Sequence, residues 1–176
     1  AGASADFARL QSVIVGATNL VFTMLAIAII DHFGRKKLML VGSLGYILSL
    51  GTVAWAFHTE RGGAIVLGCF LLFIASHAFG QGAVIWVFIS EIFPTQVRAK
   101  GQALGSFTHW FMCAAISWTF PMLVGRPDAP GASQAGARVF AFYAGMMVLQ
   151  LIWVIAMMPE TKGVPLEKIQ KELGIE

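Results

Sequence analysis

Several uncharged hydrogen-bonding side chains lie deep inside the most apolar part of the sequence. His77, Gln81 and Trp86 stand within a charge-free run that begins at Gly62 and ends before Glu91. Polar groups at mid-depth in hydrocarbon are costly to bury, so they are candidate functional groups. These three residues are therefore candidates for a ligand site within a membrane.

Two glycines flank Gln81 and can loosen the helix that carries these residues. His77 and Trp86 are nine residues apart, which places them on opposite sides of a straight helix at about 100° per residue. A kink at Gly80 or Gly82 would bring both side chains to one cavity, and broken helices mark binding sites in transporters. Tryptophan usually prefers the membrane interface, so Trp86 at mid-membrane favours a site, with simple packing as the alternative.

Two further apolar runs carry polar groups at similar depth. His109 and Cys113 share one helical face, with Trp110 beside them. Asn19 lies near the middle of the first run, with Thr23 one turn farther on the same face. An amide at that depth must find a partner or line a wet cavity. Asn19 is thus either a binding residue or a hydrogen-bonding contact between two helices.

The two histidines allow a rival interpretation, which is axial ligation of a haem or coordination of a metal. Such a site needs a second pair of ligands or a nearby carboxylate, and none stands at helical spacing from His77 or His109. Because ligand number and geometry decide metal sites, we expect no metal, no cofactor and no enzyme activity.

Charged residues return at the ends of the apolar runs, on one expected side of the membrane. An acid and a base at opposing helix ends can pair across the bundle, and such pairs break and re-form when helices move. The alternative is simple anchoring at the lipid headgroups. The residues concerned are Asp31, Arg35, Glu91, Arg98 and Glu160.

The composition indicates what must position these residues. The chain is 57% hydrophobic and 12% charged, with a mean hydropathy of +0.76. A soluble domain of this length could not bury so much apolar surface, so a lipid bilayer is the expected surrounding. Cys69 and Cys113 both lie in apolar runs, which favours buried thiols over a disulfide framework. Five runs are long enough to span a membrane as helices, at about 10–30, 38–57, 62–90, 101–125 and 139–158.

Basic residues set the expected orientation of these helices. They concentrate in segments 31–37 and 91–100 and in the tail, which by the positive-inside rule are cytoplasmic. Because they stand at membrane edges, we expect no nucleic-acid partner. Leu166, Ile169 and Leu173 recur at helical spacing and predict a short amphipathic helix over 165–173 at the membrane surface. The sequence thus predicts an all-α, multi-pass membrane bundle over 1–158 and a cytoplasmic tail over 159–176.

Three short motifs stand at the ends of the predicted helices. They are DHFGRKK at 31–37, WVFISEIFP at 86–94 with Arg98 beyond it, and PETKG at 159–163. Together they resemble the sugar porter family of the major facilitator superfamily. The first is similar to the D/E-x-x-G-R-R/K loop after that family's eighth helix, the second to its tenth-helix signature, and the third to the segment after its twelfth helix. The resemblance implies that the chain comprises helices eight to twelve of a carrier in the cell membrane.

The resemblance also implies roles for the candidate residues. In that family an asparagine at the position of Asn19 bonds sugar hydroxyls, and a tryptophan at the position of Trp86 packs against the sugar ring. The charged residues match a cytoplasmic network that stabilises the outward-facing state. The candidate substrate-binding residues are Asn19, His77, Gln81, Trp86, His109, Trp110 and Cys113.

The sequence departs from the family in several ways. The family's seventh helix and N-terminal half have no counterpart here, the chain begins at Ala1 without Met, and no signal-peptide pattern follows. We therefore interpret it as a fragment whose partner is the missing half of the same carrier. The tenth-helix prolines are absent, so the break should be softer. The expected function is alternating-access transport of a monosaccharide or similar polyol, with proton coupling open. The alternatives are a carrier of a non-sugar solute and the haem or metal protein above.

Overall fold

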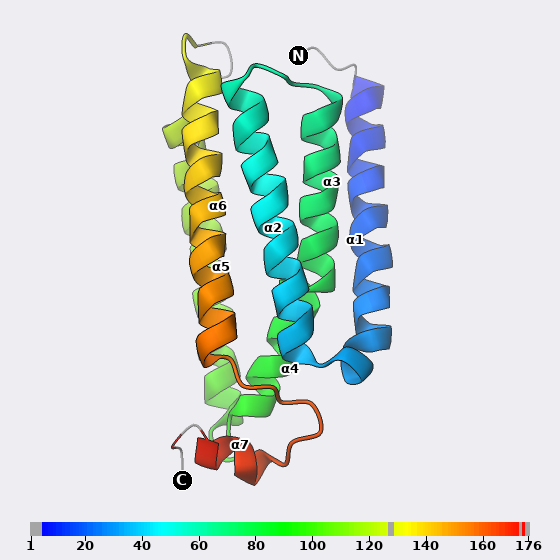
Figure 1. The fold of residues 1–176 in the computed structure, drawn as a ribbon, viewed down its shortest axis with the longest axis vertical. Helices are drawn as coiled ribbons and strands as arrows, with labels where there is room; N and C mark the ends of the chain where they lie inside the picture. Colours follow the sequence, from blue (N-terminus) through cyan, green and yellow to red (C-terminus); the bar gives the residue numbers. More distant parts are fainter. Residues whose placement is uncertain (1–4, 127–128, 173, 175–176) are drawn as a thin grey trace.

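The structure, a computed structural model, describes residues 5–126, 129–172 and 174. Five stretches are long and apolar enough to cross a membrane, which confirms the predicted all-α bundle. These long helices stand side by side, and a short last helix lies across one end of the bundle (Figure 1). Within the described residues the helices are α1 (Ala5–Phe33), α2 (Arg35–His58), α3 (Ala64–Phe79), α4 (Gln81–Ile92), α5 (Arg98–Val124), α6 (Ala132–Met157) and α7 (Leu166–Glu172).

Several helices extend beyond the apolar runs from which they were predicted. α1 begins at Ala5 and α6 at Ala132, earlier than the expected starts at residues 10 and 139. Hydropathy marks only the length that faces lipid. Backbone hydrogen bonding can continue through the small and charged residues that follow at the membrane edge.

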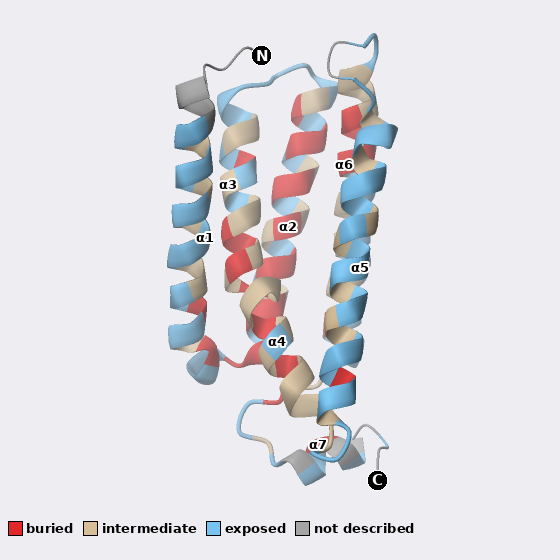
Figure 2. Ribbon diagram, turned by 180° about the vertical axis from the view of Figure 1, so that it is seen from behind, coloured by how far each residue is buried: buried red, intermediate tan, exposed pale blue. Residues whose placement is uncertain are grey.

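α2 is the central helix of the bundle. It packs against α1, α3, α4 and α6. Half of its apolar window is buried, against none of that of α5 (Figure 2). Large apolar side chains on α1 and α5, such as Leu20 and Phe107, are more than half exposed. These surfaces are suited to contact with lipid or with further protein.

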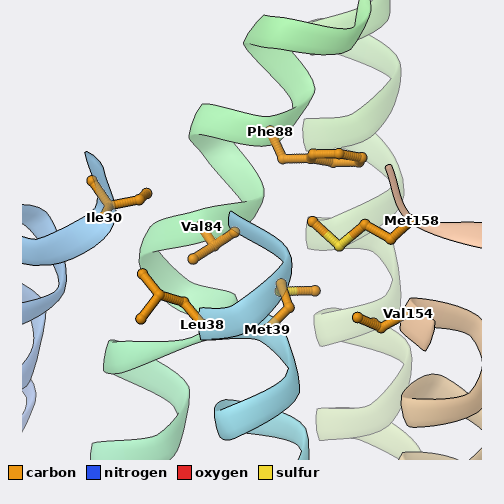
Figure 3. Packing of buried hydrophobic residues seen from close by; sticks show 7 residues of the cluster. All are labelled: Ile30, Leu38, Met39, Val84, Phe88, Val154 and Met158. Carbon is orange, nitrogen blue, oxygen red and sulfur yellow. The ribbon is translucent and has the colours of Figure 1, made fainter. Parts of the chain in front are cut away.

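Two clusters of buried apolar side chains hold the helices together. The first joins the ends of α1, α2, α4 and α6 next to the charged edge (Figure 3), and consists of Ile30, Leu38, Met39, Val84, Phe88, Val154 and Met158. The second joins α2, α3 and α6 farther up the bundle, and consists of Leu50, Val53, Ala54, Cys69 and Phe140. Cys69 is thus a buried free thiol, and Cys113 is also free.

The third spanning segment is broken where two glycines allow a neighbouring backbone to approach. α3 ends and α4 begins at Gly80, whose φ and ψ are both −99°. A Cβ on Gly42 of α2 would lie 2.9 Å from the Cα of Gly80, closer than side-chain carbons pack. Glycine at both positions therefore lets α2 contact the break directly. The predicted break is observed, and it needs no proline.

Substitution of Gly42 by alanine is expected to lower the stability of the full-length protein by about 1–3 kcal/mol, the usual cost of overpacking. The added Cβ would lie 2.5 Å from Oε1 of Gln81 as well as against Gly80. Thermal unfolding of the purified protein in detergent measures the effect. Gly51→Ala, on the same helix, is the matched control because its Cβ would meet nothing within 4 Å. Equal melting temperatures for the two variants would contradict the close contact.

The tail helix α7 packs against α4. Ile169 is only 2% exposed, so this part of its apolar face is turned toward the protein and not toward a membrane surface. The side chain of Leu166 and all of Leu173, which complete the predicted apolar face, lie outside the described part of the chain.

Candidate functional site

Trp86 on α4 and His109 on α5 join these two helices. Their ring centroids are 5.3 Å apart with an interplanar angle of 73°, an edge-to-face contact. Such pairs contribute about 0.5–1.5 kcal/mol beyond their buried area, so each ring fixes the other. Trp86 nevertheless remains 40% exposed. Its indole therefore keeps free apolar surface for a ligand.

The neighbours of His109 follow the predicted helical face. Sγ of Cys113 lies 3.7 Å from Nε2 of His109, one turn away. Trp110 meets the edge of His109 at 5.3 Å between centroids, but it is 66% exposed. Most of the Trp110 indole thus lies outside the bundle, facing lipid or a further part of the protein.

Asn19 lies on α1, on the opposite flank of α4 from His109. Its side chain is exposed. α4 contacts both α1 and α5, whereas α1 and α5 do not contact each other. Asn19 and His109 therefore lie on the two helices that flank α4, and among the described residues no hydrogen bond or ring contact joins Asn19 to the aromatic pair.

His77 forms a hydrogen bond with a residue that was not predicted from the sequence. Nδ1 of His77 lies 2.5 Å from the hydroxyl of Tyr46 on α2. Tyr46 is 6% exposed, and its ring packs on Phe73 with centroids 4.7 Å apart. The partners are 31 residues apart on different helices, so no periodicity could pair them. The available signal was a tyrosine inside an apolar run, because a buried hydroxyl needs a partner.

Gln81 faces α2 and not the aromatic pair. Its Nε2 donates to Oγ of Ser43 at 3.0 Å, and Ser43 donates in turn to the carbonyl of Met39. Oε1 of Gln81 is buried without a partner among the described residues. The side chain thus forms a contact between helices at the break, and the structure does not bring it to Trp86 or His109.

The described residues supply few ligands for a metal ion. Within the described residues, no group of three or more His, Cys, Asp or Glu side chains is placed to hold one. His77 and His109 are each paired with an aromatic side chain instead. This arrangement suits an uncharged ligand with hydrogen-bonding groups and apolar faces.

At the charged edge, Arg35 is the centre of the ion-pair network. Its Nη2 and Nε donate to the two carboxylate oxygens of Glu91 at 2.6 and 3.0 Å, and its Nη1 lies 2.9 Å from Asp31. The Arg35 residue is buried at 8% exposure. A two-point contact between guanidinium and carboxylate is among the stronger ion pairs, so it fixes α4 against the start of α2.

Glu160, from the PETKG motif, binds the start of α2. Its carboxylate accepts from the backbone N–H groups of Arg35 and Lys36 at 2.8 and 3.0 Å, where a negative charge is favoured by the helix dipole. Gly34 permits this, because its φ is +88° and a Cβ there would lie 2.5 Å from a Glu160 oxygen. Thr161 adds a hydrogen bond to Glu91 at 2.5 Å. Sequence analysis named Glu160 but missed Thr161 and the backbone donors.

Arg98 is held differently from the other predicted members of the network. Its Nε donates to the carbonyl of Phe93 at 3.3 Å, whereas the ion pairs to Asp31 and Glu91 are made by Arg35. Arg98 lines a cavity of about 410 Å³ together with Glu91 and Thr161. It therefore stands beside the network without pairing in it.

The helical fold agrees with comparisons to known proteins. Residues 1–173 match the family model for sugar (and other) transporters. The chain belongs to this sugar transporter family. The resemblance to the sugar porters of the major facilitator superfamily, predicted from the three motifs, is thereby confirmed, and the chain is a multi-pass membrane protein.

Several relatives in the sugar transporter family are named after a sugar. The chain is 38% identical to the D-xylose-proton symporter of Escherichia coli over 96% of its length. It is 31% identical to the glucose facilitated diffusion protein of Zymomonas mobilis over 97%, and 33% identical to the arabinose-proton symporter of Bacillus subtilis over 90%. It spans 34%, 36% and 33% of these relatives, about a third of each.

Solved structures of the family share the fold. The chain superimposes on a double-tryptophan mutant of XylE with a TM-score of 0.88 at 37% identity, covering 97% of this chain and 36% of that one. It also superimposes on the proton:xylose symporter XylE bound to 6-bromo-6-deoxy-D-glucose, with a TM-score of 0.85, 37% identity and the same coverage.

Proposed function

We propose that this chain is the C-terminal transmembrane part of a carrier that moves a monosaccharide or similar polyol by alternating access. The chain spans about a third of the length of each relative, which supports the idea that the other half of the carrier belongs to the same, longer protein. The exposed apolar surfaces of α1 and α5 would supply part of the contact with that half. A transporter is proposed, and not an enzyme, because the family is one of transporters.

The observation that carries this proposal is the Trp86–His109 pair beside the helix break. A sugar presents hydroxyl groups and apolar C–H faces. The indole of Trp86 covers a ring face with a large, stiff apolar surface, while imidazole and amide groups match hydroxyls as donors and acceptors. Acidic residues of the described spans stand at their ends and not at mid-depth, which suits an uncharged substrate. The substrate would lie between this part and the partner half near mid-membrane.

Orientation and coupling are part of the same proposal. The basic residues in the first turns of α2 and α5 stand at the end of the bundle where α7 lies (Figure 1). The positive-inside rule supports a cytoplasmic location for that end. Two relatives are named proton symporters and one a facilitated diffusion protein. A carboxylate that couples transport to protons would come from the partner half, because the acidic residues of the described spans stand at their ends. Uptake measurements therefore have to decide whether transport is coupled to protons.

The test is uptake of radiolabelled D-xylose, glucose, arabinose and a polyol by cells that express the full-length protein and lack their own carriers. We expect saturable uptake of at least one of these, with competition from unlabelled sugar. An uncoupler should suppress accumulation if protons drive transport and leave equilibration unchanged if they do not. Saturable uptake of a non-sugar solute alone would favour the alternative carrier, and no flux by protein present in the membrane would overturn the proposal.

A further inference from the structure

The contact between Tyr46 and His77 is a side-chain hydrogen bond between α2 and α3. It joins the Tyr46 hydroxyl to Nδ1 of His77 at 2.5 Å. His77 lies thirteen residues into the span Ala64–Ile92, about 20 Å along the helix axis. The bond therefore stands near mid-membrane, where water competes little and an unpaired polar group is costly.

The surroundings of the tyrosine decide which atom carries the proton. Tyr46 is 6% exposed, and its hydroxyl has no other hydrogen-bond partner among the described residues. If Nδ1 carried a proton and donated it, the O–H of Tyr46 would be buried without an acceptor, which is unfavourable. If Tyr46 donates instead, both atoms are satisfied. The second arrangement is favoured, so Nε2 carries the proton of the neutral ring.

Nε2 is the edge of His77 that remains available. The ring lies over Gly82, where a Cβ would be 3.1 Å from both Nε2 and Cδ2. A side chain at this position would crowd that edge, and glycine avoids this. His77 is partly exposed, and Nε2 has no hydrogen-bond partner in the part of the chain that the structure describes. A donor is thus presented at mid-membrane on the segment that also carries Trp86.

We propose that Tyr46 is a positioning residue that fixes His77 as a hydrogen-bond donor to an oxygen of the substrate. Tyr46 does not touch the substrate; it selects the tautomer and holds the ring. The site would then require a hydrogen-bond acceptor at one position of the sugar. This inference rests on the proposed function. It adds Tyr46 to the site and a requirement for a hydrogen-bond acceptor on the sugar.

The first test compares sugar analogues in the full-length protein, using the substrate found in the uptake assay. Each hydroxyl is replaced in turn by hydrogen or by fluorine, which accepts a hydrogen bond but cannot donate one. At one ring position the deoxy sugar should compete about tenfold more weakly than the fluoro sugar, the value of one hydrogen bond. In Tyr46→Phe this difference should fall below about threefold, with a raised KM and a nearly unchanged maximal rate. Tyr46→Phe should have no further effect in a His77→Phe background.

Tyr143→Phe is the matched control, because it removes the other tyrosine hydroxyl of the chain from α6. It should keep the fluoro-over-deoxy preference. A Tyr46→Phe protein that transports with an unchanged KM and the same preference would overturn the positioning role and leave the proposed function intact. Absence of any sugar transport by the unmodified protein would overturn the proposed function instead.

The second test needs no substrate. ¹⁵N spectra of the imidazole of His77 distinguish the ring nitrogen that carries the proton. We expect Nε2 to be protonated and Nδ1 to be an acceptor in the purified full-length protein, and a mixture of tautomers in Tyr46→Phe. A proton on Nδ1 in the unmodified protein would overturn the inference, even if Tyr46→Phe were poorly folded.

Discussion

Replacing Trp86 by alanine in the full-length protein is expected to remove most saturable sugar uptake while the protein stays folded in the membrane. The indole is fixed edge-to-face against His109 yet remains 40% exposed. That exposed surface is the part a sugar ring would cover. Full burial of a large apolar side chain contributes about 1.5–3 kcal/mol, so we expect the apparent affinity to fall about tenfold to a hundredfold.

Trp153→Ala is the matched control for this experiment. Trp153 lies on α6 and is 46% exposed, nearly the same fraction as Trp86, but among the described residues the ring contacts of His109 are with Trp86 and Trp110 and not with Trp153. Its replacement should leave uptake unchanged. The amount of each variant in the membrane must be measured so that expression does not mimic loss of function. Normal uptake by Trp86→Ala, or an equal loss in both variants, would remove the indole from the site.

Asn19→Ala in the same assay tests whether α1 contributes to that site. An amide that bonds sugar hydroxyls should cost about tenfold in apparent affinity per lost bond at the upper end of the usual range. Thr18→Ala on the same helix is the control, because the Thr18 hydroxyl bonds the carbonyl of Ile14 at 2.8 Å. If Asn19→Ala transports normally while Trp86→Ala does not, α1 contributes no binding group through Asn19.

The sequence predicted the spanning helices and the break between α3 and α4. Long apolar runs report how far a helix lies in lipid, and glycine reports where a backbone can bend or approach another. Both signals lie within a short stretch of sequence, so they can be recognised without knowing which helices pack together. The Arg35–Glu91 pair was also predictable, because both charges stand at helix ends on the same edge.

The partners of single side chains were not predictable in the same way. Gln81 was expected at the binding site, but it donates to Ser43 on another helix. Tyr46 was overlooked, although it bonds His77. Hydropathy specifies the depth of a residue but not the rotation of its helix, and the choice of partner depends on packing between helices that are distant in sequence. The role of each candidate in binding therefore stays a prediction.

Replacing Arg35 by glutamine is expected to release the charged edge of the bundle. The substitution leaves Glu91, whose side chain is only 27% exposed, with no cation to pair. Loss of one partner costs about 3–5 kcal/mol when an ion pair is fully buried and less than about 1 kcal/mol when it is exposed. For this half-buried pair we expect about 2 kcal/mol, which corresponds to a shift of roughly thirtyfold in the closed-to-open ratio of the edge.

Accessibility of a reporter cysteine measures that shift. Ser90 lines the cavity beside Glu91 and Thr161, so labelling at the Ser90→Cys position, followed by mass spectrometry, reports opening there. We expect Arg35→Gln to raise the labelling rate at least about tenfold, given an estimated 2 kcal/mol. Lys37→Gln is the matched control, because it removes the same charge from an exposed position two residues away on α2. Arg98→Gln should have a smaller effect than Arg35→Gln, since Arg98 bonds a carbonyl and not a carboxylate.

Removing both charges separates pairing from simple loss of charge. In the double variant Arg35→Gln with Glu91→Gln, no carboxylate is left unpaired, and two amides can bond each other and Thr161. Replacing a whole buried pair costs much less than breaking it, so labelling should return toward the rate of the unmodified protein. If instead the two substitutions add, or if Lys37→Gln opens the edge as much as Arg35→Gln, the residues act only as headgroup anchors. The two-point contact between Arg35 and Glu91 would then have no part in controlling the movement of the charged edge.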